Sequence, residues 1–204
     1  MYRKSAHLFL ILLFVGIGIG QNKRGQNMTK DNLENAVLGG GCFWCVEAVF
    51  ERVNGISEVI SGYAGGHTKN PTYKEVTSGK TGHTEVCKII FDPSIVSYDE
   101  ILDIFWQAHD PTTLNRQGND IGTQYRSAIY YTGDKQKLSA EQAIKKAEQI
   151  FDDPITTELK ELDNFYIAEG YHQDYYENNP NAPYCAFVIA PKIKKLSKKG
   201  LWDD

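Results

Sequence analysis

The chain lacks several features that would assign it to common classes of protein. Its longest apolar stretch, Leu8 to Ile19, falls short of the roughly 20 residues that a membrane-spanning helix needs. It has no excess of positive charge, because 22 Lys and Arg against 26 Asp and Glu give a net charge of −4, so nothing general favours nucleic acid as a partner. Cysteine is sparse, with four in 204 residues, and no second close Cys or His pair joins Cys42 and Cys45 to complete a four-ligand zinc site. We therefore expect no metal.

The N-terminus reads as an export signal. Arg3 and Lys4 form a short basic region, the apolar stretch follows, and small residues precede Gln21 as a signal peptidase requires. Cleavage would remove both basic residues, take the net charge from −4 to −6, and leave a mature protein with no membrane span. A membrane-anchored form and a cytoplasmic form starting at Met28 are the alternatives to a periplasmic or extracellular location. The predicted divisions are a signal peptide over 1–20, a flexible linker over 21–34 and one catalytic domain over 35–204.

Apolar periodicity predicts the order β-α-β-β-α-β, with one further helix and one edge strand. Ser97 and Glu100 form a capping box ahead of a helix that stops before Pro111. The order indicates an α+β fold, a two-layer ferredoxin-like sandwich with two long loops and an extended C-terminal coil. Strands are expected over 36–38, 56–62, 85–91, 125–131 and 155–162. Helices are expected over 42–53, 97–110 and 134–149, with Asp134 as the cap of the last one. The two long loops run from the end of the second strand to His83 and over 112–123.

Cys42 stands between the first predicted strand and the first predicted helix. The glycines at 39–41 allow a tight turn that leaves the sulfur uncovered, and the aligned peptide dipoles of a helix N-terminus favour a thiolate. Phe43 and Trp44 add two aromatic rings beside it. The pattern predicts a reactive thiol of lowered pKa in an apolar pocket.

A carboxyl group is expected on the apolar face of the third predicted strand. Alternation puts Glu85 on the same face as Cys87, Ile89 and Phe91, where lost solvation would raise its pKa and keep it protonated as a general acid. The alternative is that Glu85 sits at the solvated start of the strand and has no role. Tyr73 and Tyr125, near the two long loops, could each hydrogen-bond a polar substrate atom, but among twelve tyrosines their spacing alone favours core or surface packing.

Three other readings of the cysteines remain open at this point. Cys42 and Cys45 form a C-x-x-C at a helix start, as in a thioredoxin-like thiol–disulfide exchange enzyme. Four cysteines in an exported chain are also compatible with a disulfide-stapled binding module. A papain-like hydrolase would need His109 or His172, but the residues around Cys42 do not match that signature, and we assign these histidines no role.

Several separate motifs, in one order, resemble the A-type peptide methionine sulfoxide reductases over about residues 35–185. They are GCFW at 41–44, GYAGG at 62–66, NPTYKEV at 70–76, GHTE at 82–85, FDP at 91–93, HDP at 109–111, QGND at 117–120 and GTQYRS at 122–127.

The resemblance implies reduction of methionine S-sulfoxide, free or in proteins, to methionine. By matching motifs it implies Cys42 as the attacking thiolate and Glu85 as the proton donor to the sulfoxide oxygen. The substrate-binding residues that it implies are Phe43 and Trp44 around the methyl group, Tyr73 and Tyr125 as hydrogen-bond donors to the oxygen, and Asp120 on the polar side.

The resemblance also implies a second thiol that resolves the cysteine sulfenic acid as a disulfide. Cys185 matches the family's first resolving position, in the predicted C-terminal coil, and Cys45 is an alternative resolver or a packing residue. Unlike many relatives, the chain has no cysteine after Cys185. We expect Cys87 in the core, no bound cofactor, thioredoxin or an equivalent dithiol as external reductant, and a monomer.

Overall fold

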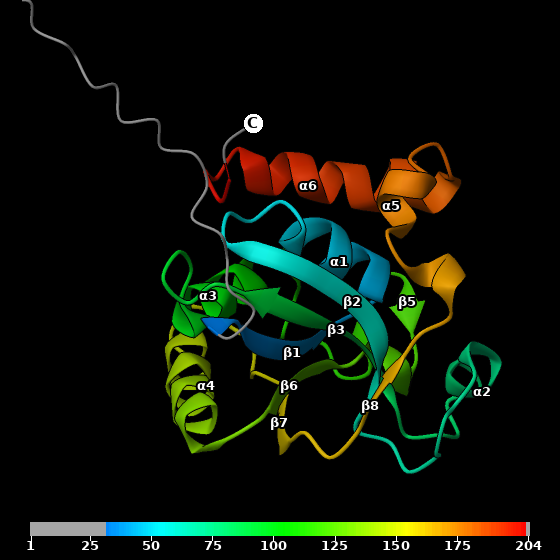
Figure 1. The fold of residues 1–204 in the computed structure, drawn as a ribbon, viewed down its shortest axis with the longest axis horizontal. Coiled ribbons are helices and arrows are strands. Elements are labelled where there is room, and N and C mark those ends of the chain that lie inside the picture. Colours follow the sequence, from blue (N-terminus) through cyan, green and yellow to red (C-terminus); the bar gives the residue numbers. More distant parts are fainter. Residues whose placement is uncertain (1–31, 203–204) are drawn as a thin grey trace, which may run out of the picture.

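The computed structural model describes residues 32–202 (Figure 1). The predicted signal peptide and nearly all of the predicted linker lie outside the described residues. No helix within residues 32–202 is long and apolar enough to cross a membrane.

The fold is built on a mixed six-stranded sheet with helices packed against it, which confirms the mixed class expected from the sequence (Figure 1). The strand order is β7-β6-β1-β3-β2-β8, and all neighbouring pairs are antiparallel except β6 with β7. The inner order β6-β1-β3-β2 is compatible with the predicted ferredoxin-like unit. The strands are β1 (Glu34–Gly40), β2 (Ile56–Ala64), β3 (Thr84–Phe91), β6 (Ser127–Tyr131), β7 (Glu158–Glu161) and β8 (Phe165–Ile167).

The two faces of β3 bury different side chains, as its alternation predicts. Cys87, Ile89 and Phe91 belong to the main core with the helices, whereas Val86 belongs to a smaller cluster on the opposite face. Glu85, opposite Tyr63 of β2, lies on the main-core side. The sheet thus carries one carboxyl group into the interior between β3 and the first helix.

Three helices follow the expected order along the chain. They are α1 (Phe43–Phe50), α3 (Tyr98–Ala108) and α4 (Asp134–Ala147). The capping box of Ser97 and Glu100 is present, with the Glu100 amide 3.2 Å from Ser97 Oγ and the Ser97 amide 2.8 Å from Glu100 Oε2. The prediction that Asp134 caps α4 was wrong. Gly133 is the N-cap, and Asp134 is the first helical residue.

The two long loops contain short elements of their own. The first holds α2 (Tyr73–Thr77), and the second holds the hairpin of β4 (Arg116–Gln117) and β5 (Asp120–Ile121). Tyr125 ends a 3₁₀ turn over Thr123–Tyr125 rather than starting a strand, and β6 begins two residues later. These loops bring polar residues to the end of the sheet where α1 starts (Figure 1).

The prediction of an extended C-terminal coil was wrong. The segment contains α5 (Tyr175–Asn178), a π-helix over Cys185–Ile189 and α6 (Ala190–Ser197), and α6 runs along the outside of the molecule above α1 (Figure 1). Pro191 stands in the first turn of α6, which directly continues the π-helix. Ile189 and Leu196 are almost fully buried in the main core. Tertiary burial therefore favours a helix where the prolines alone indicated coil.

Candidate active site

Cys42 is the N-cap of α1, directly after β1. Gly41 adopts a φ of +94°, which favours glycine, and a Cβ there would lie 2.6 Å from the Gln117 side chain. A Cβ on Gly39 would lie 2.8 Å from Thr84 and 3.1 Å from the backbone oxygen of Glu85. The glycines thus allow the turn, as predicted, and let β1 approach β3. Cys42 is only 7% exposed and lines a small cavity, so the expectation of an uncovered sulfur is wrong.

Glu85 reaches the same helix terminus from β3. Its Oε2 accepts a hydrogen bond of 3.2 Å from the amide of Phe43, the first residue of α1. Its Oε1 is buried and has no hydrogen-bond partner within the described residues. Burial raises the pKa of Glu85 to about 8, against the lowering effect of the Phe43 amide. The residue is 1% exposed, so the prediction of a buried carboxyl is confirmed, and its raised pKa favours the protonated form.

The thiol cavity has a volume of about 290 Å³ and is lined by both cysteines of the C-x-x-C. Tyr184 connects its polar side: the hydroxyl donates to Asp120 Oδ2 at 2.6 Å and lies 3.7 Å from Cys45 Sγ. Asp120 comes from β5, Cys45 from α1 and Tyr184 from the segment before the π-helix. The cavity therefore joins three segments that are far apart in the chain.

Aromatic rings cover the other side of the α1 N-terminus. The Phe43 and Trp44 centroids are 6.1 Å apart, and Trp44 stacks on Tyr175 at 3.6 Å. The His172 ring lies 4.9 Å from Phe43 and 4.4 Å from Tyr73. Phe43 and His172 are each 1% exposed. These rings make an apolar wall next to the carboxyl group of Glu85.

Tyr73 and Tyr125 come from the two long loops and face the same charges. Burial, and next the charge of Glu85, raises the pKa of Tyr73 to about 12. The same two causes raise the pKa of Tyr125, on which Tyr73 and Cys42 also act. Both phenols therefore remain protonated at neutral pH and can donate hydrogen bonds.

The expected low pKa of Cys42 is wrong for this structure. Burial, the neighbouring Cys45 thiol and the charge of Glu85 together raise the pKa of Cys42 well above its ordinary value. The hydrogen bond with Cys42 and the charge of Lys192 lower the pKa of Cys45 to about 7, against the raising effect of burial. The sequence-based expectation took account only of the helix N-terminus, which lowers the pKa of a thiol. In the structure, burial, Cys45 and the charge of Glu85 raise the pKa of Cys42 by more than the helix lowers it.

The four cysteines, all within the described residues, are free and buried. This contradicts the disulfide-stapled module. Cys185 has no exposed surface and lies in the π-helix, not in a coil. Cys87 is in the core, as expected, and its thiol donates to the backbone oxygen of Phe43 at 3.3 Å.

Several residues around the site were missed from the sequence. Glu47, 1% exposed on α1, accepts from Ser61 Oγ and from the Tyr175 amide, both at 3.1 Å. Glu169 accepts from the Tyr63 hydroxyl and the Tyr73 amide, both at 2.8 Å. These two carboxyl groups hold the aromatic wall in place. A Glu inside the apolar run of α1 was the one available signal, because buried acids need partners.

Comparison with known proteins agrees with this geometry. The family model for peptide methionine sulfoxide reductase matches residues 34–203. The peptide methionine sulfoxide reductase MsrA of Leptospira borgpetersenii is 58% identical over 168 residues, which are 82% of this chain and 96% of that protein.

Two solved structures have the same fold. Methionine sulfoxide reductase A of Corynebacterium diphtheriae is 39% identical with a TM-score of 0.70, over 75% of this chain and 79% of that one. Reduced Mxr1 from Saccharomyces cerevisiae is 32% identical with a TM-score of 0.73, over 77% of this chain and 91% of that one. The chain therefore belongs to the peptide methionine sulfoxide reductase family and is an oxidoreductase that reduces methionine sulfoxide.

Proposed function

We propose that Cys42 attacks the sulfoxide and Glu85 protonates its oxygen, in the S epimer of methionine sulfoxide, free or in proteins. One observation carries these roles. Cys42 caps α1, Glu85 accepts from the amide of the next residue and its charge acts on the Cys42 thiol, and the Glu85 Oε1 has no hydrogen-bond partner within residues 32–202. An orphaned, protonated oxygen beside a thiol is suited to an oxygen that must leave sulfur as a neutral group.

Substrate binding supplies the ionisation that the resting pocket disfavours. The sulfur of the S=O group is positively polarised, so its arrival beside Cys42 favours the thiolate. Cys42 loses its proton as its sulfur attacks the sulfoxide sulfur, Glu85 protonates the oxygen as the S–O bond breaks, and the hydroxyl passes to the Cys42 sulfur as methionine leaves. The sulfoxide is thereby reduced by two electrons and Cys42 is oxidised by two electrons to a sulfenic acid, while the proton released by the thiol offsets the one that Glu85 gives up. Glu85 regains its proton from solvent.

The aromatic wall and the two phenols select and orient this substrate. Phe43 and Trp44 contact the methyl group, and Tyr73 and Tyr125 donate hydrogen bonds to the oxygen. The raised pKa values of Tyr73 and Tyr125, to which the charge of Glu85 contributes, support this role because they keep both hydroxyl groups protonated. Asp120, held by Tyr184, orients the polar side of the cavity.

Resolution follows when Cys185 attacks the sulfenic acid, releases water and forms a Cys42–Cys185 disulfide. Cys185 is fully buried in a π-helix, and we propose that this helix rearranges to bring its sulfur to Cys42. π-Helical turns are rare and tend to occur at functional sites, which suits a segment that must move. Cys45, beside Cys42 in the thiol cavity, is the alternative resolver.

A dithiol protein of the thioredoxin type then reduces the disulfide by exchange, so that the enzyme repairs oxidised proteins repeatedly under oxidative stress. We further propose that the chain is exported by its N-terminal signal. N-terminal sequencing of the mature protein from fractionated cells tests the latter: a start at Gln21 agrees with cleavage.

A single-turnover experiment tests the residue roles. Reduced enzyme is mixed with either epimer of methionine sulfoxide without reductant, and methionine and cysteine links are measured by mass spectrometry. The S epimer should give methionine and a Cys42–Cys185 link, and the R epimer should give neither. With Cys185→Ser, methionine release should persist and Cys42 should stay as sulfenic acid, trapped by dimedone. A Cys42–Cys45 link at full rate in that variant would overturn the role of Cys185.

A further inference from the structure

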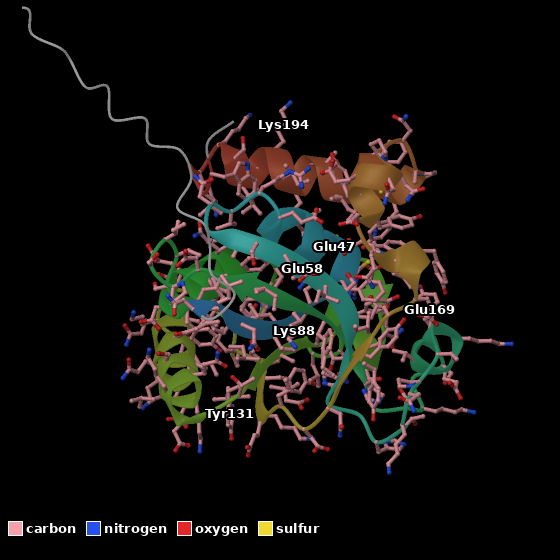
Figure 2. All side chains as sticks on the ribbon, viewed as in Figure 1. Glu47, Glu58, Lys88, Tyr131, Glu169 and Lys194 are labelled. Atoms are coloured by element: carbon pink, nitrogen blue, oxygen red, sulfur yellow. The ribbon has the colours of Figure 1, made fainter. Side chains whose placement is uncertain are left out.

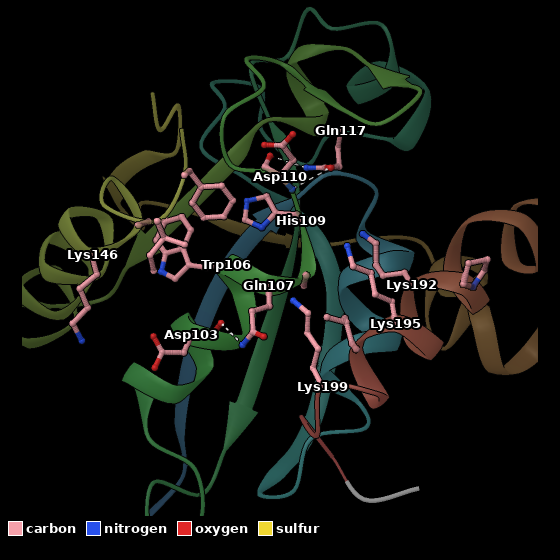
Figure 3. A pocket seen from close by; sticks show the side chains of 16 residues that line it. Asp103, Trp106, Gln107, His109, Asp110, Gln117, Lys146, Lys192, Lys195 and Lys199 are labelled. Atoms are coloured by element: carbon pink, nitrogen blue, oxygen red, sulfur yellow. Dashed lines mark hydrogen bonds between the residues drawn. The ribbon is translucent and has the colours of Figure 1, made fainter. Parts of the chain in front are cut away.

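A second cavity, of about 930 Å³, lies beside the thiol cavity between α3, α4 and α6 (Figure 3). Trp106 and Phe151 give it an apolar floor, and Ile150, 75% exposed, adds an apolar rim. We call it the lysine groove because Lys146, Lys192, Lys195 and Lys199 line it. Figure 3 shows the last three on one side and Lys146 across from them.

The position of these lysines follows from helical spacing. Lys192, Lys195 and Lys199 are three and four residues apart, so they share one face of α6 and its C-terminal turn. Lys194 and Lys198 lie on the other face and do not line the groove. Figure 2 shows Lys194 directed away from the body of the molecule.

Positive charge in the groove is not neutralised by the protein. Within residues 32–202 no ion pair involves any of the four lysines. Two carboxylates also line the groove, Asp103 and Asp110, and the hydrogen bonds that Asp110 accepts from the hydroxyl and amide of Thr112 at 2.6 and 2.9 Å keep it ionised. Four lysines against two carboxylates leave an excess of positive charge. A chain of net charge −4 thus concentrates unpaired cations beside its active site.

The groove adjoins the thiol cavity. Gln117 and Lys192 line both, and the thiol cavity also contains Cys42 and Cys45. A polypeptide that presents a methionine sulfoxide to Cys42 must lay its neighbouring residues on the adjoining surface. One direction of the chain leads from Cys42 past Gln117 into the groove.

We infer that the lysine groove binds an acidic stretch of the substrate polypeptide next to the methionine sulfoxide. This rests on the proposed function, because it takes Cys42 as the point of attack. Carboxylates of the stretch pair with Lys146, Lys195 and Lys199, and its apolar residues lie over Trp106 and Ile150. The groove therefore selects among oxidised sites in proteins by their surroundings, a preference that free methionine sulfoxide cannot show.

Matched peptides test this preference. Each contains one methionine S-sulfoxide with aspartates on its N-terminal side, aspartates on its C-terminal side, or glutamines in their place. One of the two acidic peptides, the one whose aspartates reach the groove, should have a kcat/KM about tenfold above that of the glutamine peptide at low salt. The difference should come from a lower KM. The advantage should disappear near 1 M salt, where charges are screened within about 3 Å. Equal values for all three peptides would overturn the inference.

Two double variants with the same change in charge locate the effect. Lys195→Glu/Lys199→Glu should remove the advantage of the acidic peptide, and Lys194→Glu/Lys198→Glu, on the other face, should keep most of it. Equal losses in both would mean general attraction rather than a groove. A rise only in the KM for thioredoxin would assign the groove to the reductant and also overturn the inference. Free methionine S-sulfoxide separates the failure of this inference from the failure of the proposed function. If the wild type does not reduce free methionine S-sulfoxide, the proposed function is refuted.

Discussion

Replacement of Glu85 by Gln gives the sharpest test of the proposed chemistry. The amide keeps the shape of the side chain and can still accept from the Phe43 amide, but it has no acidic proton to give. General acid catalysis of this kind contributes about 10²–10⁴-fold, so the rate of methionine release should fall by that factor. This loss corresponds to about 3–5 kcal/mol of activation free energy.

The pH dependence of the wild type follows from the raised pKa of Glu85. A general acid works in its protonated form, and a pKa of about 8 keeps about nine-tenths of Glu85 protonated at pH 7 and about one-tenth at pH 9. The contribution of the protonated acid to the single-turnover rate should therefore fall about tenfold over that interval. In Glu85→Gln the inflection near pH 8 should be absent.

The assay is rapid-quench measurement of methionine from reduced enzyme with saturating methionine S-sulfoxide, which needs no external reductant. Glu51→Gln is a matched control, because burial likewise raises the pKa of Glu51 to about 8, but at the opposite end of α1 from Cys42. The control should keep both the rate and the inflection. A Glu85→Gln enzyme within tenfold of the wild type, or a control that loses the inflection, would refute the role of Glu85.

Three further predictions concern stability and thiol reactivity. Since the pKa of Glu85 rises from about 4.3 unfolded to about 8 folded, the wild type should lose about 1.4 kcal/mol per pH unit between these values. Glu85→Gln should lose less by the contribution of this one group, while Glu51, whose pKa is also raised, contributes in both proteins, and urea unfolding at pH 5 and pH 8 measures the difference. Alkylation of resting Cys42, followed by peptide mapping, should inflect above the free-cysteine value of about 8.5, and an inflection below it would contradict the raised pKa. Ser97→Ala should lower the free energy of unfolding by about 1 kcal/mol through loss of the cap, with unchanged kcat.

Local features of the site could be predicted from the sequence. The turn at Gly41 and the placement of Cys42 at the start of α1 depend on neighbouring residues, and both are confirmed. The inward direction of Glu85 follows from alternation along one strand, and the capping box of Ser97 from a four-residue pattern. Each depends on interactions within a few residues of the chain.

Features that depend on distant contacts could not be predicted. The raised pKa of Cys42 comes from burial and from Glu85 on another element. Tyr184 and Asp120 are 64 residues apart, so no local pattern indicates their hydrogen bond. The C-terminal segment is helical because Ile189 and Leu196 find a core to pack against, which its prolines and asparagines do not reveal.

The complete burial of Cys185 has a consequence for an enzyme that works among oxidants. Peroxides and stray thiol reagents attack sulfur that they can touch, and a thiol with no solvent contact in the resting state is shielded from them. In the proposed reaction, the electrons that Cys185 supplies for resolution are thus kept in reserve until Cys42 has been oxidised. The proposed rearrangement of the π-helix would release them, so that the reducing power of Cys185 is kept for the substrate.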